Sequence, residues 1–309
     1  MRRPKERSRH LTPALMIILL AALSCACDGR PLDAGKTAKP ANSTSATDLD
    51  TSNVTTPSPP RIAAQPPSPS SMMYMIYQKD GDGALSYEIE NGSVATYWYS
   101  HTFDLGGKHW HTAFAYSTPE KYGGPADETP PAPDTTVTIA QATMVKDSAD
   151  SEKPWVFSGN DYSVGEFGAY ERAGEIDKSR KLENQASADG RLVLAIPTTF
   201  FANGIKASSY EVFVFNPADL DLKANYGQKR WTHVGNIPAG EDNDADCGPD
   251  AGDRTCYRTR GILSFTATGG NDLPDIRVTL SGDAQPGAAE GQVADYAFDA
   301  GRKQYLERP

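Results

Sequence analysis

The sequence predicts an all-β protein, built as an antiparallel β-sandwich, a barrel or a small propeller-like array, that follows a disordered N-terminal tether. About ten short runs beyond residue 72 alternate apolar and polar positions or are rich in β-branched and aromatic residues, with Gly, Pro and Asp between them. Residues 28–71 contain no aromatic residue and are rich in Pro, Ser, Thr and Ala, so they cannot bury enough apolar surface to offset the entropy of ordering. The chain has no strict internal repeat, which argues against the propeller.

The N-terminus has the composition of a secretory signal. A basic segment is followed by the apolar run 11–23 and then by small residues, which predicts a signal peptide over residues 1–24. The sequence A-L-S-C-A-C resembles a bacterial lipobox, and that resemblance implies acylation of Cys25, with Cys27 as the alternative. Ala22, three positions before Cys25, favours Cys25 and with it an outer-membrane location. If Cys27 carries the lipid, Asp28 resembles an inner-membrane retention signal.

Residues 25–71 are accordingly predicted to be a lipid anchor and linker, and residues 72–309 a β-rich periplasmic domain, with 72–150 and 190–309 as two candidate lobes. The linker would reach on the order of 40 Å. The predicted signal peptide carries five of the 30 Lys and Arg residues and one of the 40 Asp and Glu residues, so the remainder has a formal charge of −14. This charge excludes a nucleic-acid partner and favours a basic protein or a divalent cation.

Ten strands are expected along the domain. Residues 94–104 and 108–116 are predicted to form a hairpin through Gly106 and Gly107. The others are expected at 137–145, 192–201, 210–215, 231–237, 261–267, 275–280, 293–299 and 302–306. Pro197 predicts a bulge or an edge position in its strand, because proline lacks a backbone donor. The charged segment 166–185 is expected to be a surface helix or a long loop.

Two close cysteines enclose an acidic loop. Cys247 and Cys256 are predicted to form a disulfide, as is usual in an oxidising compartment. The loop 241–253 is a candidate Ca²⁺ site, although its spacing departs from the EF-hand pattern, and a candidate surface for a basic protein partner. The acids proposed to contact that partner are Asp242, Asp244, Asp246, Asp250 and Asp253.

Three histidines lie on the predicted Gly106–Gly107 hairpin. His109 and His111 are two apart on one strand and therefore share a face, and His101 lies across the hairpin. Together they are a candidate Zn²⁺ site, to which Asp104 would add an oxygen. The remaining histidine, His233, has no obvious partner in the sequence.

Motifs for catalysis are missing. The sequence contains no G-x-S-x-G nucleophile elbow and no glycine-rich phosphate loop, and both cysteines of the domain are expected to be oxidised. We therefore expect a binding protein and not an enzyme.

The segments Y-E-V-F-V-F, W-T-H-V-G-N-I-P-A-G and L-P-D-I-R-V-T-L-S-G, with the two cysteines between the last two, cover about a third of the chain. They resemble the C-terminal part of periplasmic lipoproteins of the immunity or inhibitor type. That resemblance implies a lipid-anchored module that blocks a cell-wall hydrolase. The alternatives are a metal-dependent envelope hydrolase that uses the hairpin histidines, and a structural or assembly lipoprotein of the envelope.

Overall fold

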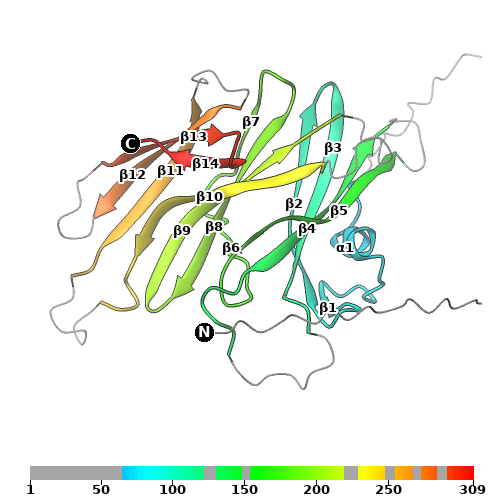
Figure 1. Ribbon diagram of the computed structural model, residues 1–309, viewed down its shortest axis with the longest axis horizontal. Coiled ribbons are helices and arrows are strands. Elements are labelled where there is room, and N and C mark those ends of the chain that lie inside the picture. Colours follow the sequence, from blue (N-terminus) through cyan, green and yellow to red (C-terminus); the bar gives the residue numbers. More distant parts are fainter. Residues whose placement is uncertain are drawn as a thin grey trace, which may run out of the picture. The chain divides into compact units, whose positions relative to one another are not determined.

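Two antiparallel sheets pack against each other in a sandwich-like all-β fold (Figure 1), which confirms the predicted class. The structure is a computed structural model and describes residues 65–121, 130–147, 154–218, 229–247, 255–266, 273–283 and 291–309. These residues belong to one unit, 60–309. The predicted signal peptide, Cys25 and Cys27 lie outside the described residues.

The first sheet is a five-stranded meander in which every strand pairs with its neighbours in sequence. It consists of β1 (Ser86–Glu88), β2 (Val94–Leu105), β3 (Lys108–Ser117), β4 (Val137–Lys146) and β5 (Trp155–Phe167). Gly106 and Gly107 join β2 to β3 with φ angles of 61° and 72°, a left-handed conformation that glycine adopts without a steric penalty. The predicted hairpin is therefore confirmed.

The second sheet has nine strands, in the order β14-β13-β12-β11-β10-β9-β8-β6, with β7 also paired to β8. Its strands are β6 (Glu175–Ile176), β7 (Glu183–Ala186), β8 (Leu192–Ala202), β9 (Ile205–Phe215), β10 (Trp231–Asp242), β11 (Arg258–Thr266), β12 (Asp275–Asp283), β13 (Val293–Asp299) and β14 (Gln304–Glu307). The chain passes from the first sheet to the second between β5 and β6.

The sequence predicted a bulge or an edge position at Pro197. The structure shows no bulge there between β8 and β9. It pairs in register with Tyr210, and the β8–β9 ladder continues through it. On the other side of β8, β7 pairs as far as Ala195 and β6 begins at Thr198. Pro197 thus lies in the gap between two short outer strands, where its missing N–H costs no ladder hydrogen bond.

The core between the sheets is aromatic. Trp98, Phe114, Phe213, Phe215 and Trp231 are buried there. A second apolar cluster covers the opposite face of the nine-stranded sheet and includes residues of β8 to β14. This explains the nearly continuous apolar run of β8, which is buried on both faces.

The one helix among the described residues, α1 (Pro69–Tyr77), covers the outer face of the five-stranded sheet (Figure 1). Ser68 caps its N-terminus and accepts a hydrogen bond from the Ser71 amide. Met72, Met73 and Ile76 are buried. They pack on a floor of small residues, namely Ala95, Ala113, Ala115, Ala140 and Ala142. The predicted boundary at residue 72 therefore falls inside a helix, and the apolar segment there is helical because its buried residues follow a 3.6-residue period.

All ten expected strands are present, and their ends differ from the predicted ends by a few residues. The strands β1, β5, β6 and β7 were not predicted, because they are short or polar and carry no clear alternation. The segment 166–185 contains the end of β5, a loop, β6 and β7, so its interpretation as a surface helix was wrong.

Candidate functional site

A pocket of about 800 Å³ opens on the nine-stranded sheet beside the inter-sheet core. Its floor comes from β8, β9 and β10, and includes Thr198, Ser209, Glu211, His233 and Asn236. Its walls are formed by the end of β5 and the following segment, and by β11 and β12 with their flanking residues. Trp98, which belongs to the core, donates a hydrogen bond to the Gly174 carbonyl and so holds one wall against the five-stranded sheet.

The centre of the floor is a buried carboxylate. Glu211 is 3% exposed, and each of its two oxygens has a partner on β10. The Oε2 atom lies 2.8 Å from His233 Nε2, and Oε1 accepts a hydrogen bond of 2.7 Å from Asn236 Nδ2. The same amide nitrogen donates to the Ser209 hydroxyl, whose oxygen is 3.0 Å from the Thr198 hydroxyl. This arrangement gives each carboxylate oxygen a partner and fixes the orientation of the group.

A β-bulge in β10 brings His233 and Asn236 to the same carboxylate. His233 pairs with Phe213 and Asn236 pairs with Glu211, with a register shift between His233 and Gly235. Phe213 and Glu211 are two apart on β9 and share a face, whereas residues three apart on a regular strand do not. The extra residue in β10 therefore turns both polar side chains toward Glu211.

His233 is fixed by close packing as well. Its ring centroid lies 5.2 Å from that of Phe167 and 5.1 Å from that of Phe213. On β5, a Cβ atom added to Gly165 would lie 2.5 Å from His233 Cβ, so a residue without a side chain is required at this crossing. The histidine is thus held between the two sheets with its Nε2 directed at Glu211.

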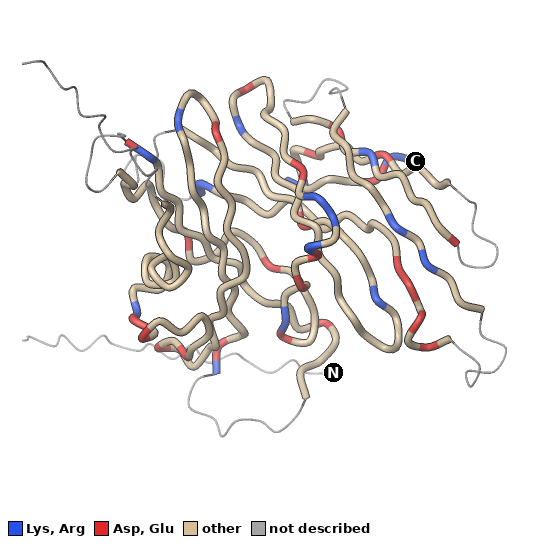
Figure 2. Tube along the Cα trace, turned by 180° about the vertical axis from the view of Figure 1, so that it is seen from behind, with Lys and Arg blue, Asp and Glu red and all other residues tan. Residues whose placement is uncertain are grey.

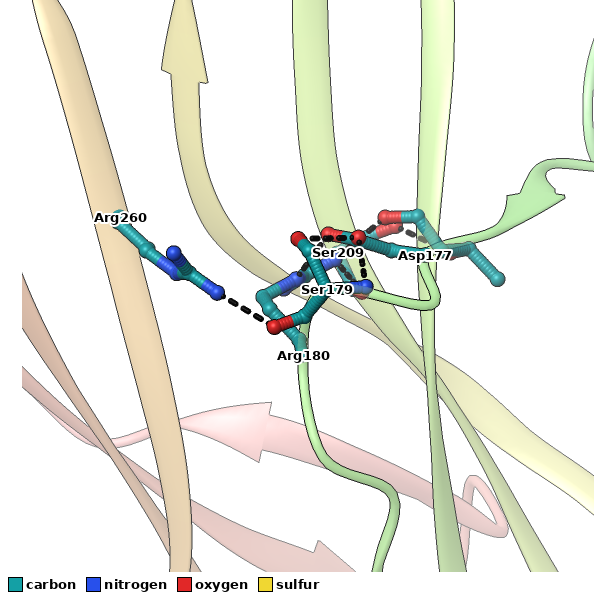
Figure 3. A network of polar contacts seen from close by, with 6 residues as sticks. Asp177, Ser179, Arg180, Ser209 and Arg260 are labelled. Atoms are coloured by element: carbon teal, nitrogen blue, oxygen red, sulfur yellow. Dashed lines mark hydrogen bonds and ion pairs between the residues drawn. The ribbon is translucent and has the colours of Figure 1, made fainter.

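A second polar network supports the pocket from the loop between β6 and β7 (Figure 3). The Arg180 Nη2 group donates to the carbonyls of Thr198 and Ser209, at 2.6 and 2.9 Å, and Arg180 Nε donates to Asp177 Oδ2 at 2.7 Å. Arg260 of β11 donates to the Ser179 carbonyl of the same loop. A continuous chain of hydrogen bonds therefore connects Asp177, through Arg180 and Ser209, to the floor of the pocket.

The ionisation of Asp177 reflects this network. Burial by itself would raise the pKa of its carboxyl group, but hydrogen bonds from Ser179 and Arg180 and the charge of Arg180 outweigh burial and lower the pKa to about 2. Asp177 is therefore fully ionised at neutral pH.

The lining of the pocket carries acidic side chains and no Lys or Arg among the described residues. Its carboxylates belong to Glu166, Glu211 and Glu241, and its larger apolar side chains are Phe167, Phe200, Pro238, Tyr257 and Leu280. Just outside the lining, the Arg172 guanidinium lies 5.4 Å from the centroid of the Phe200 ring. The site therefore combines apolar walls with a negative charge.

The predicted acidic surface begins where this pocket ends. Glu241 lines the pocket and is followed by Asp242, and Figure 2 shows acidic residues succeeding one another at this end of β10. Arg258 forms ion pairs with Asp242 and Asp244, so part of the predicted acidic charge is neutralised internally.

The remaining residues of that surface are only partly described. Asp246 packs beside Gly204 of the β8–β9 turn, while Asp250 and Asp253 lie outside the described residues. The predicted disulfide joins Cys247 to Cys256. In the part of the chain that the structure describes, no group of three or more His, Cys, Asp or Glu side chains is placed to hold a metal ion, which leaves the Ca²⁺ prediction for 241–253 without a described ligand set.

The hairpin histidines do not come together as predicted. His109 pairs with Asp104 and His111 with Thr102, whereas His101 pairs with Thr112. Paired residues share a face, and Thr112 alternates with His111, so His101 points to the opposite side of the sheet from His109 and His111. The expected three-histidine Zn²⁺ arrangement was therefore wrong, because the register of the hairpin separates its members.

His109 and His111 have local polar contacts instead. His109 Nδ1 lies 2.7 Å from Asp104 Oδ1, and His111 Nδ1 lies 2.9 Å from the Thr102 hydroxyl. Burial lowers the pKa of His101, and burial together with the nearby His101 and His109 lowers the pKa of His111 to about 4.

Sequence reasoning missed the central pair of the pocket. One signal was available: Glu211 interrupts the apolar alternation of 210–215 on the face shared by Phe213 and Phe215, so its carboxylate had to be buried. A buried carboxylate needs a hydrogen-bonding partner, and His233 was the histidine left without one. The bulge that joins them leaves no clear mark in the sequence.

No helix in the described ranges is long and apolar enough to cross a membrane. Comparison with protein-family models, with curated proteins and with solved structures found no match to this chain.

Proposed function

We propose that the protein is a lipid-anchored module of the bacterial envelope that binds a basic protein, plausibly a cell-wall hydrolase, and inhibits it. The observation that carries the proposal is the open pocket of about 800 Å³, whose lining contains three carboxylates and neither Lys nor Arg among the described residues. The signal-like N-terminus and the net negative charge of the chain support the same class of partner.

The geometry favours binding over catalysis. Both oxygens of Glu211 are engaged with His233 and Asn236, which suits a group that is held rigidly to recognise a partner. The Ser209 hydroxyl is engaged with Asn236 and Thr198, while His233 is directed at Glu211, so Ser209 lacks the base that activates a serine nucleophile. The alternative, a metal-dependent hydrolase at the β2–β3 hairpin, loses support because His101 faces away from His109 and His111.

Binding to a purified basic cell-wall hydrolase of the lysozyme class tests the proposal. The full-length chain in detergent micelles is titrated into the hydrolase, and lytic activity and complex formation are followed at low and moderate salt. We expect a stoichiometric complex that inhibits lysis and weakens as salt rises, since surface charges are screened. Absence of inhibition across a panel of basic hydrolases would overturn the inhibitor assignment and favour the structural or assembly role.

The proposed anchor is tested by metabolic labelling with an acyl-chain analogue. We expect the Cys25→Ala variant to lose the label and the Cys27→Ala variant to keep it, with both compared against the unaltered chain. The reverse pattern would move the lipid to Cys27 and, because Asp28 follows it, the proposed location to the inner membrane. Labelling of neither cysteine in the unaltered chain would contradict the anchor itself.

A further inference from the structure

We propose that the pocket on the nine-stranded sheet receives an arginine side chain of the partner and that Glu211 is the group that binds its guanidinium. This inference rests on the proposed function, because it names the chemistry by which a basic protein is recognised. Of the acidic loop 241–253 it uses only Glu241, which lines the pocket, since Asp242 and Asp244 are already paired with Arg258.

Glu211 has unused capacity for hydrogen bonds. A carboxylate offers about four acceptor positions, two on each oxygen. The contacts with His233 and Asn236 use one position on each oxygen. A further position on both oxygens remains for a donor that enters the pocket, and a guanidinium can occupy two such positions at once through its parallel N–H groups.

The charge of the floor favours a cation. Glu211 is 3% exposed, and a buried carboxylate is costly unless a positive charge is near. The nearest guanidinium in this network, that of Arg180, is directed at Asp177 and at two backbone carbonyls. The described lining contains neither Lys nor Arg, so a guanidinium from a partner would place a permanent positive charge beside Glu211.

The walls suit a guanidinium better than an ammonium. Phe167, Phe200 and Tyr257 line the pocket, and a guanidinium stacks on aromatic faces and is less strongly hydrated than an ammonium. Two arginines of the chain already do this close by: Arg172 lies over Phe200, and Arg180 lies 4.7 Å from the centroid of Tyr210. Glu166 and Glu241 on the rim would attract the incoming side chain before it reaches the floor.

The test compares two ligands of almost the same shape. The full-length chain is titrated with N-acetyl-arginine amide and with N-acetyl-citrulline amide, which replaces the guanidinium by a neutral urea, and binding is followed by ligand-observed NMR. We expect saturable binding of the arginine compound and at least about tenfold weaker binding of the citrulline compound, as for the loss of one charge-assisted pair. Equal binding of the two compounds would overturn the inference.

Variants locate the site. Glu211→Gln keeps the size of the side chain and removes its charge, and we expect it to weaken binding of the arginine compound by about tenfold or more. Glu90→Gln, which removes an exposed charge near the five-stranded sheet, is the matched control and should leave binding unchanged. If Glu211→Gln fails to fold, the double variant Glu166→Gln/Glu241→Gln on the rim takes its place, and unchanged binding in a folded variant contradicts the site.

The outcomes separate this inference from the proposed function. A hydrolase that is inhibited equally by the unaltered chain and by Glu211→Gln, without competition from the arginine compound, would leave the inhibitor function standing and reject the arginine pocket. Charge-dependent binding of the arginine compound without inhibition of any basic hydrolase would support the pocket and reject the function.

Discussion

His233 Nε2 lies 2.8 Å from Glu211 Oε2, although 22 residues separate the two in sequence and a β-bulge is needed to align them. The pair connects the two sheets, because His233 is packed by Phe167 of the five-stranded sheet and Glu211 belongs to the floor of the pocket on the nine-stranded sheet. Its loss should therefore affect both stability and the shape of the binding site.

Replacing Glu211 by alanine tests the structural part of this pair. The change leaves His233 and the Asn236 amide without their buried acceptor, and we expect the free energy of unfolding to fall by about 2–4 kcal/mol in urea denaturation. Glu90→Ala, at an exposed position, should change it by less than about 0.5 kcal/mol. Equal stability of the two variants would show that the Glu211 hydrogen bonds make no net contribution to the free energy of unfolding.

Gly165→Ala tests the crossing of β5 over His233. The added methyl group would lie 2.5 Å from His233 Cβ, so the histidine must move or the sheets must separate. We expect a loss of about 1–3 kcal/mol in the free energy of unfolding and a change in the NMR signals of the His233 ring. A variant with unaltered His233 signals would contradict the close approach of the two sheets at this point.

The pKa of Asp177 predicts a stability loss in strong acid. Its native pKa is lowered from 3.8 to about 2, so the unfolded chain binds a proton first as the pH falls. The stabilisation is complete above pH 3.8 and is lost as the pH drops toward 2, by on the order of 1–2 kcal/mol. Unfolding curves recorded through this range should show less pH dependence in Asp177→Asn than in the unaltered chain. If stability depends on pH equally in both proteins, Asp177 is not the cause of the loss in acid.

His111 predicts a second, separate pH dependence. Its native pKa of about 4 lies below the ordinary value of 6.5, so between these values the unfolded chain binds a proton that the native chain does not. Stability should therefore fall as the pH decreases from 6.5 to about 4. His111→Gln should flatten thermal unfolding curves in this range, whereas Glu90→Gln, at an exposed position away from His111, should not. If the pH dependence of stability persists in His111→Gln, a different titrating group causes it.

The disulfide between Cys247 and Cys256 should stabilise the fold at the end of β10. The two cysteines are 9 residues apart, and in the chain-entropy model closing so short a loop contributes about 2–3 kcal/mol. Cys247→Ser/Cys256→Ser is expected to lower the free energy of unfolding by this amount, and reducing agent should destabilise the unaltered chain but not the double variant. A response of both proteins to the reductant would point to a different redox-sensitive group.

Local sequence patterns predicted the elements well where a strand has a clear run of alternating or apolar residues. Tyr210, Val212 and Val214 alternate with Phe213 and Phe215, and both sets are buried in β9 as the period of two requires. The same reasoning failed for β5, which has exposed apolar residues and shifts of register against β4. It also failed for the helix α1, whose nine residues cover only about two helical turns. Short amphipathic segments are ambiguous because either period fits them.

The hairpin histidines show a different limit of prediction from the sequence. The shared face of His109 and His111 followed directly from alternation and is present. The position of His101 depended on the register between β2 and β3, and a shift of one residue moves a side chain to the opposite face. The turn at Gly106 and Gly107 set that register and placed His101 on the core side, stacked 5.8 Å from Phe103.

The sequence by itself determined the all-β class, ten of the strands and the cysteine pair, because each depends on residue type and on spacing along the chain. Tertiary structure alone decided the pocket. It required the bulge in β10 to turn His233 and Asn236 toward Glu211, the absence of a side chain at Gly165, and the hydrogen bonds from Arg180 to β8 and β9. These are relations between strands distant in sequence, and they are set by packing and buried hydrogen bonds that no local pattern records.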